Sequence, residues 1–444
     1  AAVDQLNVHT YGTARRTSAR DVAKAEQRPL WMSEVEGSWG NDYTSMNSGL
    51  GMAQRIIDDI RELEPTAWVL WQPIEDVKNM VAEGNLQWGS VHVPFDCTAT
   101  DTLATCPVRT NTKYDTIRNF THYIRPGDHM VKVSGTSSLA AVSKDDKRAT
   151  VVHANPDPAA QAVTLDLSKF GKIARTATVT PVVTSATGKL IEGEPVPVTD
   201  DRATLTVPGQ SVTTFLVTGV SKVERDLAHI QVGHAYRVQG VQSGRSLDAT
   251  AKIRTNDPAA ADQLWTVEKA GTERYRLVNA GTGRQLAVRG GTVLTEAVGP
   301  ADEAAQWRVS TTGDGTYTLI NVGARQLLDV PGGAVADGTS VAVYTPTSGS
   351  NQLWRLQDET VPEIETATSY TLPGRMPTMP ATVTAVLIGG EHRNLPVTWN
   401  LPAPKKFEKP GTVDVKGTAT DVLGRTTKAR AEVTVDTFPT TEPA

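Results

Sequence analysis

The sequence predicts a protein of several domains, in which a segment of alternating strands and helices is followed by three all-β regions. Two observations carry this prediction. Apolar runs and helical periodicities alternate over residues 1–130, whereas short β-type runs separated by turn residues fill the remainder. In addition, 444 residues are too many for a single hydrophobic core, so two to four domains are expected.

The first segment is expected to hold a parallel sheet, because its strands alternate with helices. Apolar residues recur at helical spacing between Leu50 and Ile60, with Ser48 as the expected N-cap, and a second helix is expected over residues 114–124. The predicted strands are residues 7–11, 29–37 and 66–71. So few strands cannot close a barrel, so we expect this domain, residues 1–130, to be incomplete at its N-terminus.

The later regions differ in their periodicity. Residues 131–219 hold short alternating strands at turn-sized spacing, which predicts an antiparallel β-sandwich. Residues 367–436 have the length of one small immunoglobulin-like sandwich, and residues 437–444 look like a linker tail.

An internal repeat fills residues 229–358, in units of about forty residues. Three units are too few for a propeller, so a threefold barrel-like fold is expected. The units end in related tags, namely Gln263-Leu264-Trp265, Ala305-Gln306-Trp307 and Gln352-Leu353-Trp354.

The composition excludes several classes of partner. The formal net charge is −5, so no basic surplus is available to displace counterions from nucleic acid. No run of about 18 apolar residues exists, and we expect no membrane span. The eight His are scattered and no paired Cys-x-x-Cys occurs, so neither a metal nor a cofactor is expected.

The informative carboxylates follow Trp31-Met32-Ser33. On a regular strand, residues 32, 34 and 36 share one face, so Glu34 and Glu36 are predicted to point together. Carboxylates inside a parallel barrel are costly unless they act at its carboxyl-end rim. The alternative is that one or both are solvated acids in the following loop.

Three ordered motifs resemble glycoside hydrolase family 30, which combines a (β/α)8 barrel with a side β-sandwich. They are Trp-Met-Ser-Glu34, residues 67–73 and residues 119–128, and the resemblance covers residues 1–219. It implies that Glu34 is the nucleophile of a retaining hydrolase at the end of the seventh barrel strand, with Glu36 as its rival. Residues 7–11 would form the sixth strand and Trp71 would lie on the eighth.

The same resemblance implies neighbours for the nucleophile. His9 and Tyr11 would face the cleft, with Tyr11 placed to donate a hydrogen bond to Glu34; ordinary barrel filling is the alternative. Trp39, Trp71 and Trp88 are candidate sugar platforms, because pyranose rings stack on aromatic faces. Core packing is the alternative for each of them.

The second carboxyl group of the family follows an Asn on the fourth strand. No Asn-Glu pair occurs in this sequence. The resemblance therefore implies that the chain holds only the C-terminal part of the barrel, lacks the acid/base, and is inactive by itself.

The repeat resembles the ricin-type β-trefoil of carbohydrate-binding module family 13. In that family a lobe binds sugar through an Asp, an aromatic ring and a polar residue. The first lobe keeps Asp248 without the aromatic residue, and the second has Ala287 in place of the Asp. The third lobe keeps the whole set: Asp329, Tyr344 and Asn351. The last domain resembles bacterial immunoglobulin-like domains, for which a spacer role is expected.

Among family 30 enzymes, the Glu36-Gly37-Ser38-Trp39 loop and the trailing trefoil look most like endo-β-1,6-galactanases that act on arabinogalactan side chains. A glucuronoxylanase is the alternative enzyme, and a non-catalytic carbohydrate-binding protein is the alternative from another class. The expected partner is a plant cell-wall polysaccharide or another β-linked glycan. The protein itself is expected to be secreted and monomeric. Cys97 and Cys106 either close a local disulfide or are two free thiols.

Overall fold

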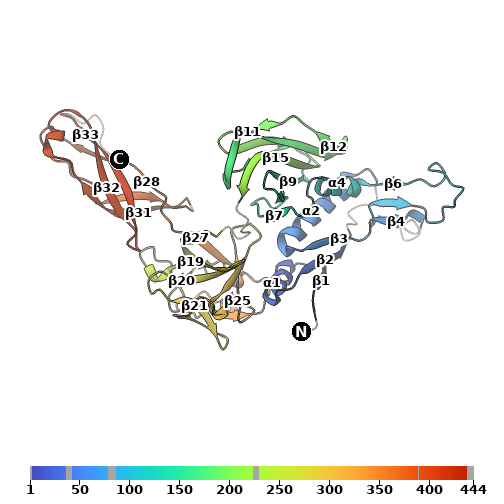
Figure 1. Cartoon of the computed structure of the whole chain (residues 1–444), viewed down its shortest axis with the longest axis horizontal. Coiled ribbons are helices and arrows are strands. Elements are labelled where there is room, and N and C mark those ends of the chain that lie inside the picture. The colour runs from blue at the N-terminus through green and yellow to red at the C-terminus, as the bar shows by residue number, and fades with distance from the viewer. Residues whose placement is uncertain (1–2, 37–42, 79–86, 224–229, 389, 438–444) are drawn as a thin grey trace.

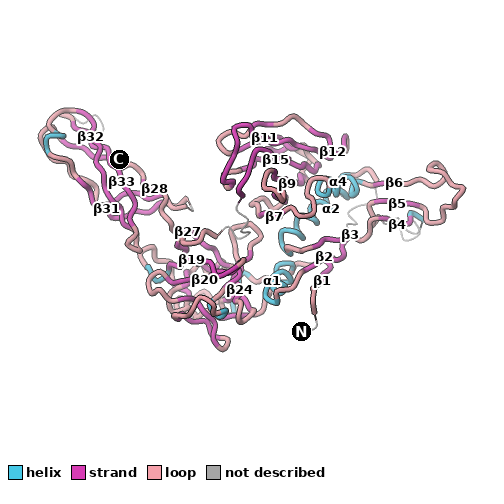
Figure 2. The backbone as a smooth tube through the Cα atoms, in the orientation of Figure 1, coloured by secondary structure: helices cyan, strands magenta, loops and turns pink. Residues whose placement is uncertain are grey.

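The structure is a computed structural model that describes residues 3–36, 43–78, 87–223, 230–388 and 390–437. Trp39, a predicted sugar platform, and residues 438–444 of the predicted linker lie outside the described residues. Figure 1 shows the described chain as successive bodies: an α/β unit, a β-sandwich above it, a second β-rich body below, and a slender sandwich that carries the C-terminal end. Helices are confined to the first body apart from short single turns (Figure 2).

The α/β unit is built on a parallel sheet of three strands, in the order β1-β2-β3. Its elements are β1 (Leu6–His9), α1 (Arg16–Glu26), β2 (Leu30–Val35), α2 (Met46–Leu63), β3 (Ala67–Leu70), β4 (Ile74–Asp76), β5 (Val91–Val93), β6 (Arg109–Thr110) and α4 (Thr112–Thr121). Strands β4, β5 and β6 form a second small sheet, and α4 packs against α2.

Helix α2 begins one turn earlier than the sequence suggested. The predicted N-cap, Ser48, is buried inside the first turn, and Ser45 caps the helix instead by accepting a hydrogen bond from the backbone N–H of Asn47 at 3.3 Å. Helix α1 was not predicted. Its buried residues are small or charged, namely Arg20, Asp21, Ala23 and Ala25, so it has no apolar periodicity to reveal it.

A β-bulge interrupts β2 beside both of its neighbours. Val8 pairs with Met32 but His9 pairs with Glu34, and on the other side Met32 pairs with Trp68 but Val35 with Leu70. One extra residue of β2 therefore lies between Met32 and Val35. Because a bulge adds one residue to a strand of period two, the side chains beyond it change faces.

The following sandwich has a large antiparallel sheet, ordered β12-β11-β15-β9-β8-β7, and a smaller pair, β10-β14. Its strands are β7 (His129–Val131), β8 (Ser138–Val142), β9 (Arg148–Asn155), β10 (Gln161–Asp166), β11 (Phe170–Ser185), β12 (Gly188–Glu192), β13 (Val196–Pro197), β14 (Arg202–Val207) and β15 (Ser211–Val223). Helix α2 shares a hydrophobic core with this body, in which Ile57 and Val152 are fully buried.

The third body repeats one structural unit three times. The fully buried indoles of Trp265, Trp307 and Trp354 each donate a hydrogen bond to a leucine carbonyl, at 2.9, 2.8 and 3.1 Å respectively. Its strands are β16 (Ala235–Gly240), β17 (Ser246–Leu247), β18 (Ile253–Arg254), β19 (Leu264–Gly271), β20 (Arg274–Asn279), β21 (Gln285–Arg289), β22 (Thr292–Glu296), β23 (Trp307–Ser310), β24 (Thr318–Asn321), β25 (Gln326–Asp329), β26 (Ala342–Tyr344) and β27 (Trp354–Asp358). Four single turns precede or separate them: η1 (Ala261–Gln263), η2 (Glu303–Ala305), η3 (Pro331–Gly333) and η4 (Ser350–Gln352).

The last body is a six-stranded arrangement in the order β28-β30-β31-β32-β33-β29, in which β29 and β33 are parallel. Its elements are β28 (Glu363–Ile364), β29 (Ala367–Thr371), β30 (Thr382–Val386), β31 (His392–Asn400), η5 (Pro404–Phe407), β32 (Gly411–Thr420) and β33 (Thr426–Val435). Within the described part of the chain, no helix has the length and hydropathy of a membrane span.

Candidate functional sites on the parallel sheet and in the repeat

The bulge in β2 decides where the carboxylates point. Met32 and Val35 are fully buried and pack with Ala23 of α1 and Leu63 of α2, on the helix-covered face of the sheet. The prediction that residues 32 and 34 share one face was therefore wrong, because the alternation is broken between them. Glu34 lies on the opposite, open face, and its side chain is 29% exposed.

Tyr11 and His9 meet Glu34 on that open face. The hydroxyl of Tyr11 donates a hydrogen bond to Oε1 of Glu34 at 3.1 Å, and Nε2 of His9 lies 3.7 Å from Oε2. The two rings stand edge to face, with centroids 6.1 Å apart. The structure thus brings together three of the residues singled out from the sequence, at the carboxyl ends of two parallel strands.

The electrostatics of the group favour a protonated tyrosine. Partial burial raises the pKa of Tyr11 to about 12, helped by the hydrogen bond to Glu34 and by the negative charges of Glu34 and Glu36. Tyr11 therefore keeps its proton at any physiological pH, so it remains a hydrogen-bond donor to the carboxylate.

Trp71 borders the same open face. Its backbone N–H donates to the carbonyl of Val35 at 2.8 Å, which continues the pairing of β2 with β3, and its side chain is 44% exposed. Trp31 is also exposed, whereas Trp68 packs under the sheet and donates its indole N–H to Asp59 at 3.0 Å. Trp71 thus has the exposure that a stacking platform needs, and Trp68 does not.

A buried polar cluster beside this edge was missed from the sequence. Glu75 and His92 are buried, with 3.5 Å between Oε2 and Nε2, and Glu75 also accepts hydrogen bonds from the backbone N–H groups of Trp88 and Gly89. Lys113 is buried as well and donates to the carbonyl oxygens of Gln87 and Trp88.

Burial lowers the pKa of Lys113 to about 8, and the charges of Glu36 and Glu75 oppose that shift. Glu36, the predicted rival of Glu34, thus interacts with a buried lysine as well as with Tyr11. No sequence motif marks this cluster, because its members come from separate elements.

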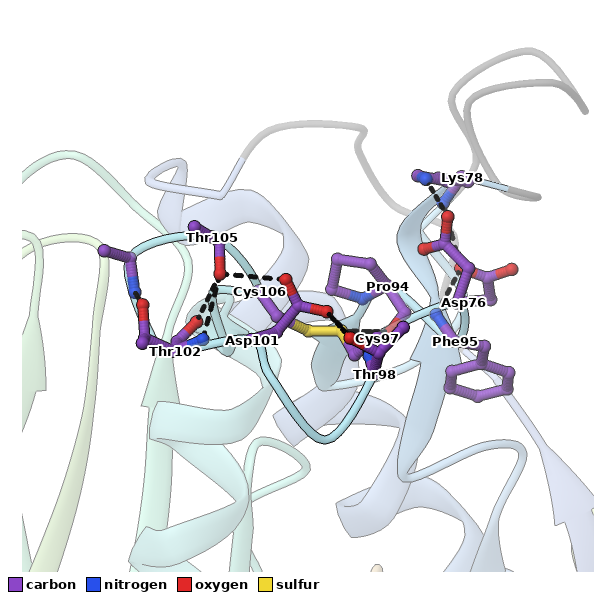
Figure 3. Close-up of a disulfide and its surroundings, with 12 residues drawn as sticks. Asp76, Lys78, Pro94, Phe95, Cys97, Thr98, Asp101, Thr102, Thr105 and Cys106 are labelled. Carbon is purple, nitrogen blue, oxygen red and sulfur yellow. Dashed lines mark hydrogen bonds and ion pairs between the residues drawn. A yellow bond between two sulfur atoms is a disulfide. The ribbon is translucent and has the colours of Figure 1, made fainter.

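A disulfide closes the loop beyond β5. Cys97 and Cys106 are bonded to each other, with Cα atoms 5.9 Å apart. Figure 3 shows Asp101 inside the loop, where its carboxylate accepts hydrogen bonds from Thr98 at 2.6 and 2.8 Å and from Thr105 at 3.0 Å. The sequence left open whether Cys97 and Cys106 form a disulfide or are free thiols, and in the structure they form a disulfide.

In the third lobe of the repeat, the predicted sugar-binding residues lie together. Asp329 ends β25, Tyr344 ends β26, and Asn351 lies in η4, where its side-chain amide donates to Oδ2 of Asp329 at 2.8 Å. Burial raises the pKa of Asp329, while the ring of Tyr344 is 57% exposed. A buried carboxylate beside an exposed ring is a suitable surface for a sugar hydroxyl and a pyranose face.

The first lobe differs, because its carboxylate already has partners. Oδ2 of Asp248 accepts from Nε of Arg254 at 3.0 Å, and Oδ1 accepts from the hydroxyl of Thr250 at 2.7 Å. Although burial acts to raise it, these bonds lower the pKa of Asp248. In the second lobe Ala287 is fully buried and offers no polar group. Only the third of the three described lobes therefore presents the full set.

No group of three or more His, Cys, Asp or Glu that could hold a metal ion occurs in the described ranges.

Two family models match the later bodies. The ricin-type β-trefoil lectin domain-like family matches residues 227–298 and 303–372, and the bacterial Ig-like domain (group 4) family matches residues 360–422.

Two curated relatives match the chain. An exo-β-1,6-galactobiohydrolase of Bifidobacterium longum subsp. longum is 29% identical over 521 aligned positions, which cover 99% of this chain and 34% of the relative. An endo-β-1,6-galactanase of Hypocrea rufa is 29% identical over 169 positions, covering 38% of this chain and 30% of the relative. The chain thus spans about a third of the length of the curated relatives that it matches.

Among solved structures, a GH30 endoxylanase from Clostridium papyrosolvens C71 is 20% identical, with a TM-score of 0.36 and coverage of 49% of each chain. These matches bear out the resemblance drawn from the sequence: the curated relatives are named as an exo-β-1,6-galactobiohydrolase and an endo-β-1,6-galactanase, and the later bodies match the ricin-type β-trefoil lectin and bacterial Ig-like models.

Proposed function

We propose that Glu34 is the nucleophile of a retaining glycoside hydrolase that acts on β-1,6-linked galactan. The observation that carries the proposal is the open-face carboxylate at the carboxyl end of a parallel sheet, held by Tyr11 at 3.1 Å and approached by His9 at 3.7 Å. Active sites of barrels of parallel strands lie at this end of the sheet. The names of both curated relatives support the linkage.

In the proposed reaction, the carboxylate of Glu34 attacks the anomeric carbon and forms a glycosyl ester, while the aglycone oxygen leaves with a proton from a second carboxyl group. Water then hydrolyses the ester, with the second group now accepting a proton. Tyr11 fixes the rotation of the Glu34 carboxylate, because its hydroxyl remains protonated and bonds Oε1. The second carboxyl group must lie about 5 Å from Glu34, and we assign it to none of the described residues.

The nucleophile is tested by covalent trapping. A protein in which these strands belong to a complete eight-stranded barrel is incubated with an activated 2-deoxy-2-fluoro galactoside, which forms a glycosyl ester that hydrolyses slowly. We expect mass spectrometry to find the label on Glu34, and we expect Glu34→Gln to abolish both labelling and turnover of β-1,6-galactan. Label on Glu36 instead, or an active Glu34→Gln enzyme, would refute the assignment.

The substrate is tested on the same protein by comparing β-1,6-galactan with glucuronoxylan. We expect release of products from the galactan only, and preferential cleavage of glucuronoxylan would favour the alternative enzyme. We further propose that the protein acts outside the cell, because a disulfide such as Cys97–Cys106 persists in oxidising compartments.

A second function, carbohydrate binding without catalysis, is supported by the third lobe. Asp329 is the lobe carboxylate without an ion-pair partner among the described residues, whereas Asp248 is bonded to Arg254. We propose that galactose-type sugars bind at Asp329, Tyr344 and Asn351. Calorimetric titration of this chain should show that Asp329→Ala removes the binding event of the third lobe while Asp248→Ala, the matched control, leaves it unchanged. Full affinity in Asp329→Ala would refute the site.

A further inference from the structure

Helix α1 lies between the two proposed sites. It begins at Arg16, shortly after Tyr11, so its first turn is at the carboxyl edge of the sheet where Glu34 and Tyr11 meet. Strands and the following helices of such units run in opposite directions, so the rest of α1 leads away from this edge. Figure 1 shows α1 on the side of the sheet that faces the trefoil.

The third trefoil lobe contacts this first turn of α1. The hydroxyl of Ser348 lies 2.7 Å from that of Thr17 and 2.6 Å from that of Ser18, and it accepts a hydrogen bond from the backbone N–H of Ser18 at 3.1 Å. Ser348 belongs to the loop that connects Tyr344 to Asn351. These are the aromatic and the amide residue of the proposed sugar site at Asp329. The lobe that presents Asp329, Tyr344 and Asn351 is therefore the lobe that touches the first turn of α1, at the edge of the sheet where Glu34 lies.

Further contacts fix the trefoil along α1. Ala25 of α1 is buried together with Ile320 and Leu327 of the third lobe. Arg20, which is 2% exposed, binds Asp21 at 2.8 Å and the hydroxyl of Thr318 at 3.2 Å. Such buried contacts hold two bodies in one arrangement.

At the far end of α1, two trefoil arginines reach Gln27. Its side-chain oxygen accepts from Arg274 at 3.2 Å and from Arg308 at 3.3 Å. A contact to the sandwich adds to these, because a Cβ atom on Gly313 would lie 2.7 Å from the carbonyl oxygen of Val133. The trefoil is thus attached at both ends of α1 and to the neighbouring sandwich.

We infer that one galactan chain occupies the open face of the sheet at Glu34 and the third trefoil lobe at the same time, so that the lobe is an extension of the proposed catalytic subsites. This inference rests on the proposed function of both sites. Because buried contacts along α1 hold the two sites in one arrangement, the second binding event of a bridging ligand is intramolecular. A trefoil attached only through a flexible linker would not keep its third lobe at a constant position relative to Glu34.

The test is calorimetry and native mass spectrometry on this chain, with β-1,6-galactobiose and a ladder of longer β-1,6-galacto-oligosaccharides. We expect the disaccharide to bind at each site independently. Above a threshold length, we expect one oligosaccharide per chain and an affinity at least about 100-fold higher, which is the low end for linked sites. Asp329→Ala and Trp71→Ala should each remove the gain for long ligands, whereas Asp248→Ala should keep it.

Three results would overturn the inference. An affinity that does not rise with length leaves the two separate sites in place but removes the bridge. Complexes of two chains on one long oligosaccharide, or a gain that survives Asp329→Ala, show that length acts by another route. Failure of every ligand to bind in the wild-type chain would refute the proposed sugar sites together with the bridge.

Discussion

The hydroxyl of Tyr11 and the carboxylate of Glu34 are 3.1 Å apart, although 23 positions separate them in the chain. Two features produce this contact: the parallel pairing of β1 with β2, and the extra residue that turns Glu34 away from the helices. The hydrogen bond between these two residues can be tested with a single substitution.

Removing the tyrosine hydroxyl should impair turnover and spare the fold. In the complete barrel, we expect Tyr11→Phe to lower kcat/KM for β-1,6-galactan by about 10- to 100-fold, since a hydrogen bond to a charged group contributes about 1.5–3 kcal/mol. The control is thermal unfolding, which should change little because Tyr11 is exposed. Unchanged kcat/KM would show that the contact has no part in catalysis.

Lys113 should make stability depend on pH. Its pKa falls from 10.5 in the unfolded chain to about 8 in the fold, so between these values the unfolded state binds more protons. The unfolding free energy should therefore rise as the pH increases from about 8 to 10.5, by about 3 kcal/mol at most. Denaturant unfolding at several pH values would measure this, with Lys113→Met as the reference.

The difference between wild type and Lys113→Met isolates this lysine from others that titrate in the same range, such as Lys132, whose pKa burial also lowers to about 8. A pH-independent difference would mean that Lys113 is no more protonated in the unfolded chain than in the fold.

The docking of the trefoil should depend on Arg20 far more than on Arg325. Arg20 is buried, and Arg20→Met leaves the buried carboxylate of Asp21 without its partner, which costs about 3–5 kcal/mol. The ion pair of Arg325 with Glu26, at 2.9 Å, is exposed and contributes about 1 kcal/mol or less. Small-angle scattering should show the trefoil released in Arg20→Met and retained in Arg325→Ala. An unaltered profile in both variants would exclude this role for Arg20.

The disulfide should stabilise its own loop and little else. The Cys97→Ser/Cys106→Ser double variant should lose about 2–3 kcal/mol of local stability, because closing a loop of this size restricts the unfolded segment. Limited proteolysis should then cut between residues 97 and 106 several-fold faster. Sugar binding at the third lobe should be unchanged, and a loss there would contradict a local role.

The sequence predicted those features that have a local or repeated signature. The Trp tags predicted a threefold body, and the buried indoles of Trp265, Trp307 and Trp354 supply its repeated hydrogen bonds. The resemblance also brought His9, Tyr11 and Glu34 to one place, although their roles stay predictions.

What the sequence did not predict depends on long-range pairing. Helix α1 was missed because Arg20 and Asp21 satisfy each other on its buried side, where apolar residues would be expected. The bulge was missed because strand alternation is visible in a sequence and an extra residue is not. The cluster of Glu75, His92 and Lys113 joins three elements through buried charges, which no spacing rule encodes.

The bulge in β2 also means that strand pairing, as much as residue type, governs the chemistry of this edge. In a regular strand that kept Ser33 without a bulge, Glu34 would share the face of Met32 and its carboxylate would turn toward Ala23 and Leu63, under the helices. A carboxyl group there would be protonated, because an isolated charge is unstable among apolar side chains. The same glutamate would then be a neutral, enclosed acid, so the bulge alone separates an open-face carboxylate from a packing defect.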